Sequence, residues 1–249
     1  GALRNMTACI NRCHLDIESR VVAPYAAGLS CLVEDEKELG VICIDMGGGT
    51  TDLSVFFDGE IVYTDSVPLG GNHVTNDIAR GLSTPVSYAE RMKTLYGSAV
   101  PSPSDDQEVI KVPLVGEEDD GENQISRSML VGIIRPRIEE IYELVREKLE
   151  PTGFEKAGAR RVVLTGGASQ LTGVRELGAE MLDKQVRLGR PNYVKGLAES
   201  VNGPAFSAPA GLIQVILKER NASAMTSSRT IAVSGGKFGR FGQWIKENI

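Results

Sequence analysis

The stretch Ile42-Cys43-Ile44-Asp45-Met46-Gly47-Gly48-Gly49-Thr50-Thr51-Asp52 is the part of the sequence that decides the fold. An apolar run from Val41 to Ile44 ends at the carboxylate of Asp45. Three glycines and two threonines follow, and then a second apolar run extends from Leu53 to Phe57. This order predicts a strand, a tight turn and a second strand, with Asp58-Gly59 as the next turn signal.

The glycine turn indicates a site for phosphate. Consecutive glycines let backbone N–H groups converge without a Cβ in the way, which produces a concavity suited to anionic oxygen. A carboxylate beside it, Asp45, suggests Mg²⁺ held mainly through water. A plain glycine hairpin is the alternative, but the flanking Asp45 and Thr50-Thr51-Asp52 favour phosphate binding. The two common phosphate loops, G-x-x-x-x-G-K-[ST] and a helix-opening G-x-G-x-x-G, are absent from the sequence.

A second glycine motif lies more than a hundred residues downstream. The sequence Arg161-Val162-Val163-Leu164-Thr165-Gly166-Gly167-Ala168-Ser169 is another apolar run that ends in a Gly-Gly turn. A helical pattern of Leu171, Val174, Leu177 and Leu182 follows. Alone this motif is typical of any strand-to-helix connection. Together with the first motif it resembles the phosphate and adenosine motifs of the actin/Hsp70/sugar-kinase group, which implies an α/β fold.

Composition limits the remaining classes. The chain has 249 residues, is 41% hydrophobic and carries a net charge of −6 with no basic block, so we expect no nucleic-acid partner. Three of its four cysteines (Cys9, Cys13, Cys31, Cys43) sit in apolar surroundings and none forms a C-x-x-C motif, which favours reduced, buried thiols. No stretch has the pattern of a signal peptide, and no apolar run approaches the ~18 residues of a membrane span.

The rest of the chain gives a coarse order of elements. Eight acids against one base make residues 104–123 an acidic segment whose tip, 117–122, is a solvated loop. The predicted elements are a strand with its approach over 6–17, a helix over 24–33 closed by the acids 34–36, a turn feeding a helix over 67–78, a short helix over 87–95, an exposed strand over 108–115, a long helix over 126–149, a helix over 209–217 and a flexible linker from Asn221 to Gly236.

The last fifteen residues differ in kind from the rest. At ~100° per residue the large apolar side chains fall within an arc of roughly 140°. These side chains are Phe238, Phe241, Trp244, Ile245 and Ile249. Beyond a linker, such a segment is typical of an amphipathic helix that binds the membrane interface, with anionic lipid as its partner. A terminal helix docked on its own domain is the alternative.

These motifs together resemble the FtsA family, bacterial actin-like cell division proteins. The resemblance rests on Ala26-Ala27-Gly28-Leu29, Glu36-x-x-Leu39-Gly40, Ile44-Asp45-x-Gly-Gly-Gly-Thr-Thr-Asp52, Gly70-Gly71-x-x-x-Thr75-Asn76-Asp77-Ile78, Leu164-Thr-Gly-Gly-Ala-Ser169 and the amphipathic tail. It extends over essentially the whole chain. The implied fold is the actin/Hsp70/sugar-kinase-like ATPase fold, here the second lobe plus a C-terminal return to the first lobe.

The resemblance also implies site residues and partners. Glu90 and Lys93, otherwise a simple charge pair, then contact the ribose and adenine of ATP. Asp45 becomes the ligand of a Mg²⁺-bound water, Gly47 to Thr51 cradle the β- and γ-phosphates, and Gly166 to Ala168 back the adenosine. The implied partners are the C-terminal tail of FtsZ, other division proteins, further copies in a filament and anionic lipid. The implied location is the cytoplasmic face of the inner membrane at the division septum. Arg127 and Arg135 are candidates to meet the carboxylate-bearing tail of FtsZ.

The sequence departs from the family in lacking the first glycine hairpin and the subdomain that follows it. We therefore expect about half a nucleotide site and no hydrolysis from this chain alone. The expected divisions are the end of an inserted first-lobe subdomain (1–23), the inner subdomain of the second lobe (24–69 and 150–203), its outer subdomain (70–149), part of the first lobe (204–220), a linker (221–234) and the membrane helix (235–249). The alternatives are an actin-like pilus assembly protein and an ATP-dependent enzyme of the sugar-kinase or Hsp70 type.

Overall fold

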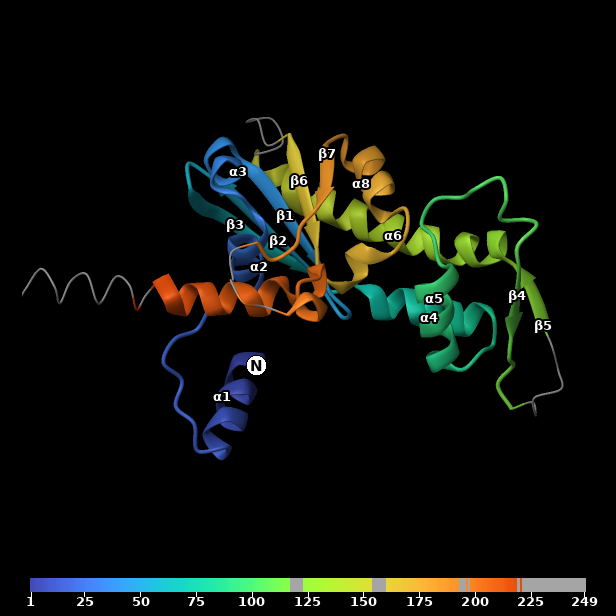
Figure 1. Cartoon of the computed structure of the whole chain (residues 1–249), viewed down its shortest axis with the longest axis horizontal. Helices are drawn as coiled ribbons and strands as arrows, with labels where there is room; N and C mark the ends of the chain where they lie inside the picture. Colours follow the sequence, from blue (N-terminus) through green and yellow to red (C-terminus); the bar gives the residue numbers. More distant parts are fainter. Residues whose placement is uncertain (117–122, 154–159, 193–195, 197, 219, 221–249) are drawn as a thin grey trace, which may run out of the picture.

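The structure, a computed structural model, describes residues 1–116, 123–153, 160–192, 196, 198–218 and 220. Its centre is a five-stranded sheet of order β3-β2-β1-β6-β7 (Figure 1). The strands are β1 (Val41–Met46), β2 (Thr51–Phe57), β3 (Glu60–Val67), β6 (Arg161–Thr165) and β7 (Gln185–Leu188). β1, β2 and β3 pair antiparallel, whereas β1, β6 and β7 pair parallel.

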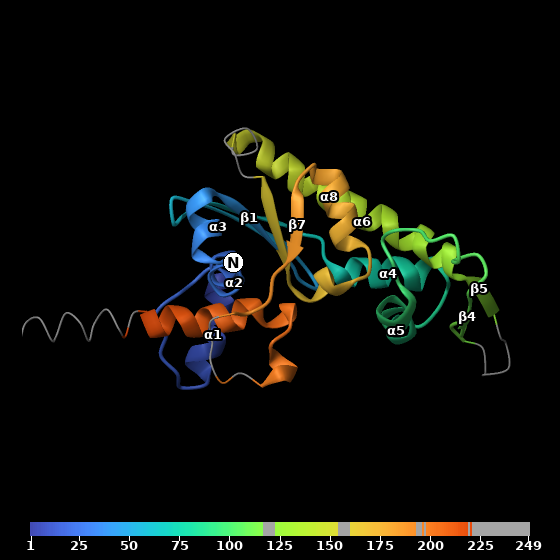
Figure 2. The same ribbon diagram turned by 45° about the horizontal axis from the view of Figure 1, so that its top comes forward.

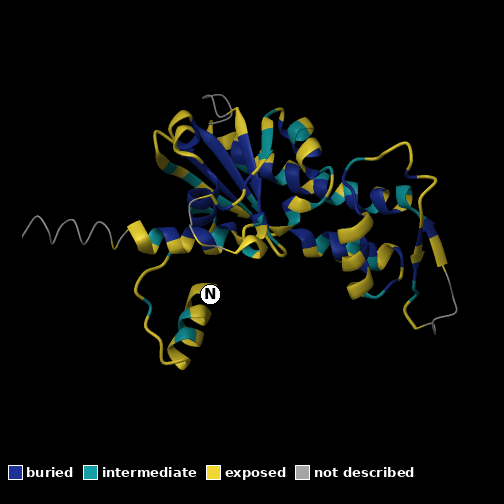
Figure 3. Ribbon diagram, in the orientation of Figure 1, coloured by how far each residue is buried: buried dark blue, intermediate teal, exposed yellow. Residues whose placement is uncertain are grey.

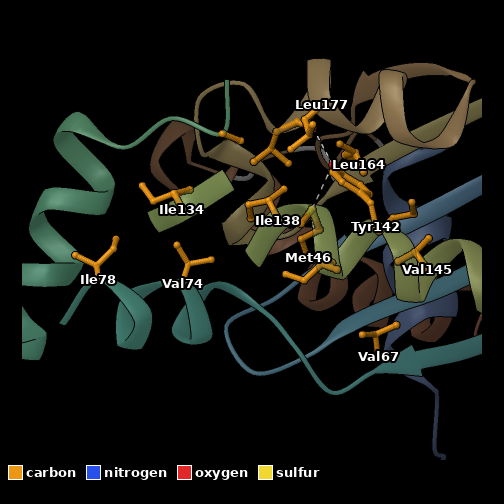
Figure 4. Close-up of a cluster of buried hydrophobic side chains, with 14 of the residues drawn as sticks. Met46, Val67, Val74, Ile78, Ile134, Ile138, Tyr142, Val145, Leu164 and Leu177 are labelled. Carbon is orange, nitrogen blue, oxygen red and sulfur yellow. Dashed lines mark hydrogen bonds between the residues drawn. The ribbon is translucent and has the colours of Figure 1, made fainter. Parts of the chain in front are cut away.

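Helices cover both faces of this sheet because β1 is apolar on both faces (Figure 2). Val41 and Cys43 pack with Leu32 at the end of α2 (Ala23–Cys31). The alternate residues Ile42 and Ile44 belong to a second, larger core under α6 (Arg127–Leu149) and α8 (Val174–Leu182). Figure 4 shows the middle of that core, where Tyr142 of α6 lies between Met46 and Leu177.

The outer part of the molecule is built from α4 (Gly71–Gly81), α5 (Val86–Tyr96), the hairpin of β4 (Val109–Val112) and β5 (Asn123–Ser126), and the first half of α6. At 1.5 Å per residue α6 is about 35 Å long, so one helix supports both the outer part and the sheet. Its N-terminus is capped by the Ser126 hydroxyl, and it continues through Pro136. The hydroxyl of Tyr63 on β3 donates to the carbonyl of Lys148 near the end of α6, which ties that end to the sheet.

Two predictions about the first forty residues were wrong. The segment predicted as a strand and its approach over 6–17 instead contains a helix, α1 (Ala2–Arg12), followed by irregular chain. Leu3, Met6 and Ile10 are spaced as on one helical face, but the predicted segment 6–17 contains only Met6 and Ile10. The acids 34–36 do not close the preceding helix but open α3 (Glu34–Leu39), where the Glu36 carboxylate accepts from the Val33 amide at 3.1 Å.

The other elements agree with the sequence to within a few residues, apart from the missed β3, β5 and β7 strands. The predicted strand over 108–115 is shorter, and the predicted helix over 209–217 runs from 207 to 218. Of the cysteines, only Cys31 and Cys43 are buried, whereas Cys9 and Cys13 are exposed; all four are free thiols. Figure 3 shows that α1 has no buried residue and is largely exposed, while β1 and β6 are almost entirely buried.

Candidate functional site

A cavity of about 420 Å³ lies where four segments meet: the glycine turn after β1, the start of α4, α5, and the turn after β6. Six of the predicted site residues line it, and they are Gly47, Gly48, Glu90, Lys93, Gly167 and Ala168. The sequence analysis did not assign Gly71, Asn72, Thr94, Gly97, Gln170, Leu171 and Thr172, which complete the lining. The structure thus brings the two distant glycine motifs and the Glu90–Lys93 pair to one cavity.

The triple-glycine turn is held by the start of α4. The amides of Gly71 and Asn72 donate to the carbonyls of Gly47 and Gly48 at 2.9 and 2.8 Å. Gly70 must be glycine for this approach, because a Cβ there would lie 2.6 Å from the Gly47 oxygen. These contacts point the carbonyls of the turn toward α4 and fix its shape.

The same turn leaves three backbone donors available. Within the part of the chain that the structure describes, the amides of Gly48, Gly49 and Thr50 have no hydrogen-bond acceptor, and the three residues are exposed. Consecutive unpaired amides are the donor set that binds anionic oxygen in backbone nests. Thr51 is different, since it is buried and its hydroxyl donates to the Leu69 carbonyl at 2.8 Å. Its side chain therefore braces the turn.

Asp45 sits at the end of β1, opposite Asp52 of β2 and next to Thr165 of β6. Burial, together with the negative charge of Asp52, raises the pKa of Asp45 from 3.8 to about 6. The Asp52 carboxylate accepts from the Ser66 hydroxyl at 2.6 Å. A half-buried carboxylate with a second one nearby is a donor set that suits a hydrated divalent cation. No group of three or more potential metal-ligating side chains occurs among the described residues.

Glu90 and Lys93 are organised by Thr75, a residue that the sequence analysis left without a role. The Lys93 ammonium donates to Glu90 at 2.7 Å, to the Thr75 hydroxyl at 2.9 Å and to the Gly71 carbonyl at 3.1 Å. These three bonds use all three ammonium hydrogens. Thr75 in turn donates to Glu90 at 2.5 Å.

The hydrogen bonds among Lys93, Thr75 and Glu90 leave the two predicted ligands, Glu90 and Lys93, with different exposure and different roles. Burial alone would raise the pKa of Glu90, but the hydrogen bonds from Lys93 and Thr75 hold it below its ordinary value, so Glu90 is ionised at neutral pH. The Glu90 side chain is 52% exposed whereas that of Lys93 is 14% exposed. Glu90 is therefore able to accept hydrogen bonds from a bound molecule, and Lys93 holds Glu90 in place and tethers α5 to the start of α4.

The turn after β6 forms the opposite wall of the cavity. Gly166 has a left-handed φ of +85°, and a Cβ there would lie 2.3 Å from the Asp45 carboxylate and 2.5 Å from the Met46 carbonyl. At Gly71 an added Cβ would come within 3.2 Å of the Ala168 Cβ, so the two turns approach closely across the cavity. Small residues line the cavity on both sides.

Arg127 and Arg135 lie in different surroundings on α6. Arg127 donates to the buried Asp105 carboxylate at 2.8 Å and to the Tyr96 carbonyl at 2.8 Å, so its guanidinium joins α6 to the segment after α5. Arg135 makes only a half-exposed pair with Glu139, one turn along the helix. Of the two, Arg135 is the more accessible to a partner.

This difference predicts unequal effects on stability. Arg127→Met would leave Asp105 buried without its charge partner, and we expect a loss of about 2–4 kcal/mol in the free energy of unfolding. Arg135→Met removes a surface pair on one helix and should cost about 0.5 kcal/mol or less. Urea denaturation of the two variants measures both values. Equal losses would contradict the structural role of Arg127.

The predicted membrane-binding residues Phe238, Phe241, Trp244, Ile245 and Ile249 lie outside the described residues, as do the linker and the acidic tip 117–122. Among the helices that the structure does describe, none has the length and apolar character needed to cross a bilayer.

Solved structures identify the class. The chain resembles MreB5 of Spiroplasma citri bound to AMPPNP, with a TM-score of 0.69 and 19% identity over 90% of this chain and 66% of that one. It also resembles the PilM-PilN type IV pilus biogenesis complex, with a TM-score of 0.63 and 20% identity over 85% of this chain and 56% of that one. The fold is therefore the predicted actin-like ATPase fold.

Sequence comparison then gives the family. The family model "Cell division protein FtsA" matches residues 42–211. FtsA of Rhizobium meliloti is 47% identical over 252 aligned residues, which cover 100% of this chain and 57% of that protein, and FtsA of Escherichia coli K12 is 34% identical over 99% and 60%. The chain belongs to the FtsA family and spans about three fifths of the length of these relatives. The resemblance to the pilus protein is one of fold.

Proposed function

We propose that this chain contains the nucleotide-binding second lobe of an FtsA-family cell division protein, with a C-terminal return to the first lobe, and that the cavity after β1 binds Mg²⁺-ATP. The three unpaired amides of Gly48, Gly49 and Thr50, in the turn that follows β1 and reaches the cavity at Gly47 and Gly48, are the observation that carries this proposal. They would receive the phosphates. Gly167 and Ala168 would lie against the adenosine, and the free oxygen of Glu90 would accept from a ribose hydroxyl. The related fold of MreB5 was solved with AMPPNP and with ADP, which supports the same ligand class here.

Mg²⁺-ATP would bring the phosphate charge and the hydrated cation to the site, and the residues of this chain would bind and orient the nucleotide. The amides of Gly48, Gly49 and Thr50 would donate hydrogen bonds to phosphate oxygens, and the Asp45 carboxylate would accept hydrogen bonds from the water shell of the cation. Lys93 and Thr75 hold Glu90 in place. We propose a binding site that gates assembly, with at most weak hydrolysis.

Binding is tested by titrating the full chain with a fluorescent ATP analogue in the presence of Mg²⁺. Because a hydrogen bond to a charged group contributes about 1.5–3 kcal/mol, Glu90→Ala should weaken affinity about 10- to 100-fold. Arg91→Ala is the matched control, since Arg91 is the next residue on α5, is exposed and does not line the cavity. Equal affinity of wild type and Glu90→Ala, or no saturable binding at all, would contradict the assignment of the site.

We further propose that the whole protein tethers FtsZ to the cytoplasmic face of the inner membrane at the septum and assembles into filaments. Membership of the family of cell division proteins named FtsA supports a role in division. In this proposal residues 70–149, with Arg135 as one candidate contact, receive the FtsZ tail. Residues 204–220 belong to the first lobe, 221–234 form a linker, and 235–249 bind anionic lipid.

The lipid-binding segment is tested by co-sedimentation with anionic liposomes. We expect the full chain to sediment and a version ending at Ser234 to stay in solution. Trp244→Glu should behave like the shortened version, because each large apolar side chain contributes about 1.5–3 kcal/mol when fully buried. Equal sedimentation of all three proteins, or of none, would contradict lipid binding by residues 235–249 and would favour a terminal helix docked on its own domain.

A further inference from the structure

Three hydroxyl groups meet in the interior behind the turn after β6. They belong to Thr165 at the end of β6, Ser30 in α2 and Ser207 at the start of the helix 207–218, and all three residues have no exposed surface. The hydroxyls of Thr165 and Ser207 lie 2.6 Å apart. The Ser30 hydroxyl lies 2.7 Å from the carbonyl oxygen of Ser207, to which it donates.

The donors and acceptors in this cluster form one consistent chain. A hydroxyl has a single hydrogen, so if Thr165 donates to the carbonyl of Gly189 at 3.2 Å or of Pro204 at 3.3 Å, Ser207 is the donor in the pair of hydroxyls. The Ser30 hydroxyl also lies 3.0 Å from the Ala27 carbonyl of its own helix, and Thr165 has acceptors outside the helix, so the Ser207 hydroxyl is the member of the cluster whose hydrogen bond requires the helix 207–218 to keep its position against β6. Buried polar groups that depend on one another in this way favour a discrete arrangement over a continuous range.

One end of the chain of hydrogen bonds reaches the candidate site. Thr165 pairs with Asp45 in the register of β1 and β6. The next residue, Gly166, donates its amide to the Pro204 carbonyl at 3.1 Å. Gly167 and Ala168 then line the cavity. A shift of this turn toward or away from a bound molecule therefore changes the geometry at Thr165 and Pro204.

The other end reaches a helix that has no residue in the cavity. The helix 207–218 packs so closely on α2 that a Cβ at Gly211 would lie 1.8 Å from the Ala26 carbonyl oxygen. Ser207 and Ala210 on the same side are also buried. Its other side is exposed and apolar at Leu212, Ile213, Ile216 and Leu217. Because the helix is packed this closely on α2, a displacement of Ser207 would move the helix together with α2 and would not slide it over α2.

We propose that Thr165 is a positioning residue that couples occupancy of the cavity to the placement of the helix 207–218 through the hydroxyls of Ser207 and Ser30. The inference rests on the proposed binding of nucleotide. A ligand that fixes the turn 166–168 selects one arrangement of the hydroxyl cluster. That arrangement in turn sets the position of the helix 207–218 and of its exposed apolar side.

Amide hydrogen exchange of the full chain, with and without Mg²⁺ and AMPPNP, tests this coupling. In wild type we expect nucleotide to slow exchange both around the cavity, at 71–75, and in the distant segment 208–218. In Thr165→Val, which keeps the shape but loses the hydroxyl, the cavity should still be protected. Its affinity should fall about three- to tenfold, the equivalent of one hydrogen bond. The nucleotide response of 208–218 should disappear.

Thr165→Ser, which retains the hydroxyl, should restore the response of 208–218. Ser207→Ala removes the other hydroxyl of the Thr165–Ser207 hydrogen bond and should also abolish the response of 208–218. This variant tests the coupling if Thr165→Val does not fold. A helix response in Thr165→Val and Ser207→Ala equal to that of wild type overturns the coupling. So does protection of 71–75 in wild type with no change at 208–218. No protection anywhere at saturating nucleotide overturns the proposed function itself and the coupling with it.

Discussion

Gly166→Ala is expected to destabilise the protein by about 2–5 kcal/mol. The φ of +85° at this position costs an L-residue about 1–2 kcal/mol. The added Cβ would also meet the Met46 carbonyl at 2.5 Å, and because that oxygen is backbone it cannot rotate away. Forcing a methyl group into such a space typically costs a further 1–3 kcal/mol or so. The expected result is a marked fall in the midpoint of urea denaturation.

Gly167→Ala is the matched control for this prediction. Gly167 is the next residue in the same turn, and a Cβ there would meet only the Ala205 Cβ at an ordinary 3.8 Å. We expect its stability to change by about 0.5 kcal/mol or less. If Gly166→Ala were as stable as Gly167→Ala, the close approach of the β6 turn to Asp45 would be wrong.

Asp45→Asn is expected to have opposite effects on stability and on binding. The pKa of Asp45 in the folded protein is about 6, against an ordinary value of 3.8, because burial and the charge of Asp52 disfavour the carboxylate. Above pH 6 the ionised form therefore costs stability, and the substitution should recover about 1–3 kcal/mol at pH 7 in the absence of nucleotide. At the same time it should weaken Mg²⁺-ATP binding about 10- to 100-fold, as loss of a group that orients a hydrated metal does.

The sign of the pH dependence follows from the raised pKa. Between about pH 4 and pH 6 the folded state holds a proton on Asp45 that the unfolded state has lost, so stability due to this group falls as pH rises through that window. Wild type should lose this stability and Asp45→Asn should not. Asp106→Asn, an exposed acid away from the cavity, is the control and should follow wild type. Parallel profiles of stability against pH for wild type and Asp45→Asn would contradict the raised pKa of Asp45.

The sequence predicted the parts of this molecule whose signals are local. The hairpin around Gly47–Gly49 and the long α6 are each specified by a continuous run of residues, a turn motif in one case and a 3.6-residue apolar period in the other. Family resemblance then brought the β6 turn and Glu90 to the same cavity, and the structure does place them together. Whether they bind ATP stays a prediction.

Other features depended on contacts between distant segments. Thr75 has no chemistry that marks it in the sequence, and its role exists only because α4 places it beside Glu90 and Lys93, fifteen and eighteen residues further along. The partners of Lys93 are likewise set by the packing of α4 on α5, since its three ammonium hydrogens bond to Glu90, Thr75 and Gly71. Arg127 was predicted as a candidate contact for the FtsZ tail, and nothing in the sequence indicates that Asp105, in an acid-rich segment, is buried beside it.

The most direct test of the central claim is a crystal structure of the full chain with Mg²⁺ and AMPPNP. The account predicts phosphate oxygens at the amides of Gly48, Gly49 and Thr50, and a ribose hydroxyl on Glu90 with Lys93 still bonded to Thr75. It also predicts the cation within a water's reach of Asp45. Nucleotide bound elsewhere, or an empty cavity at saturating concentration, would contradict it.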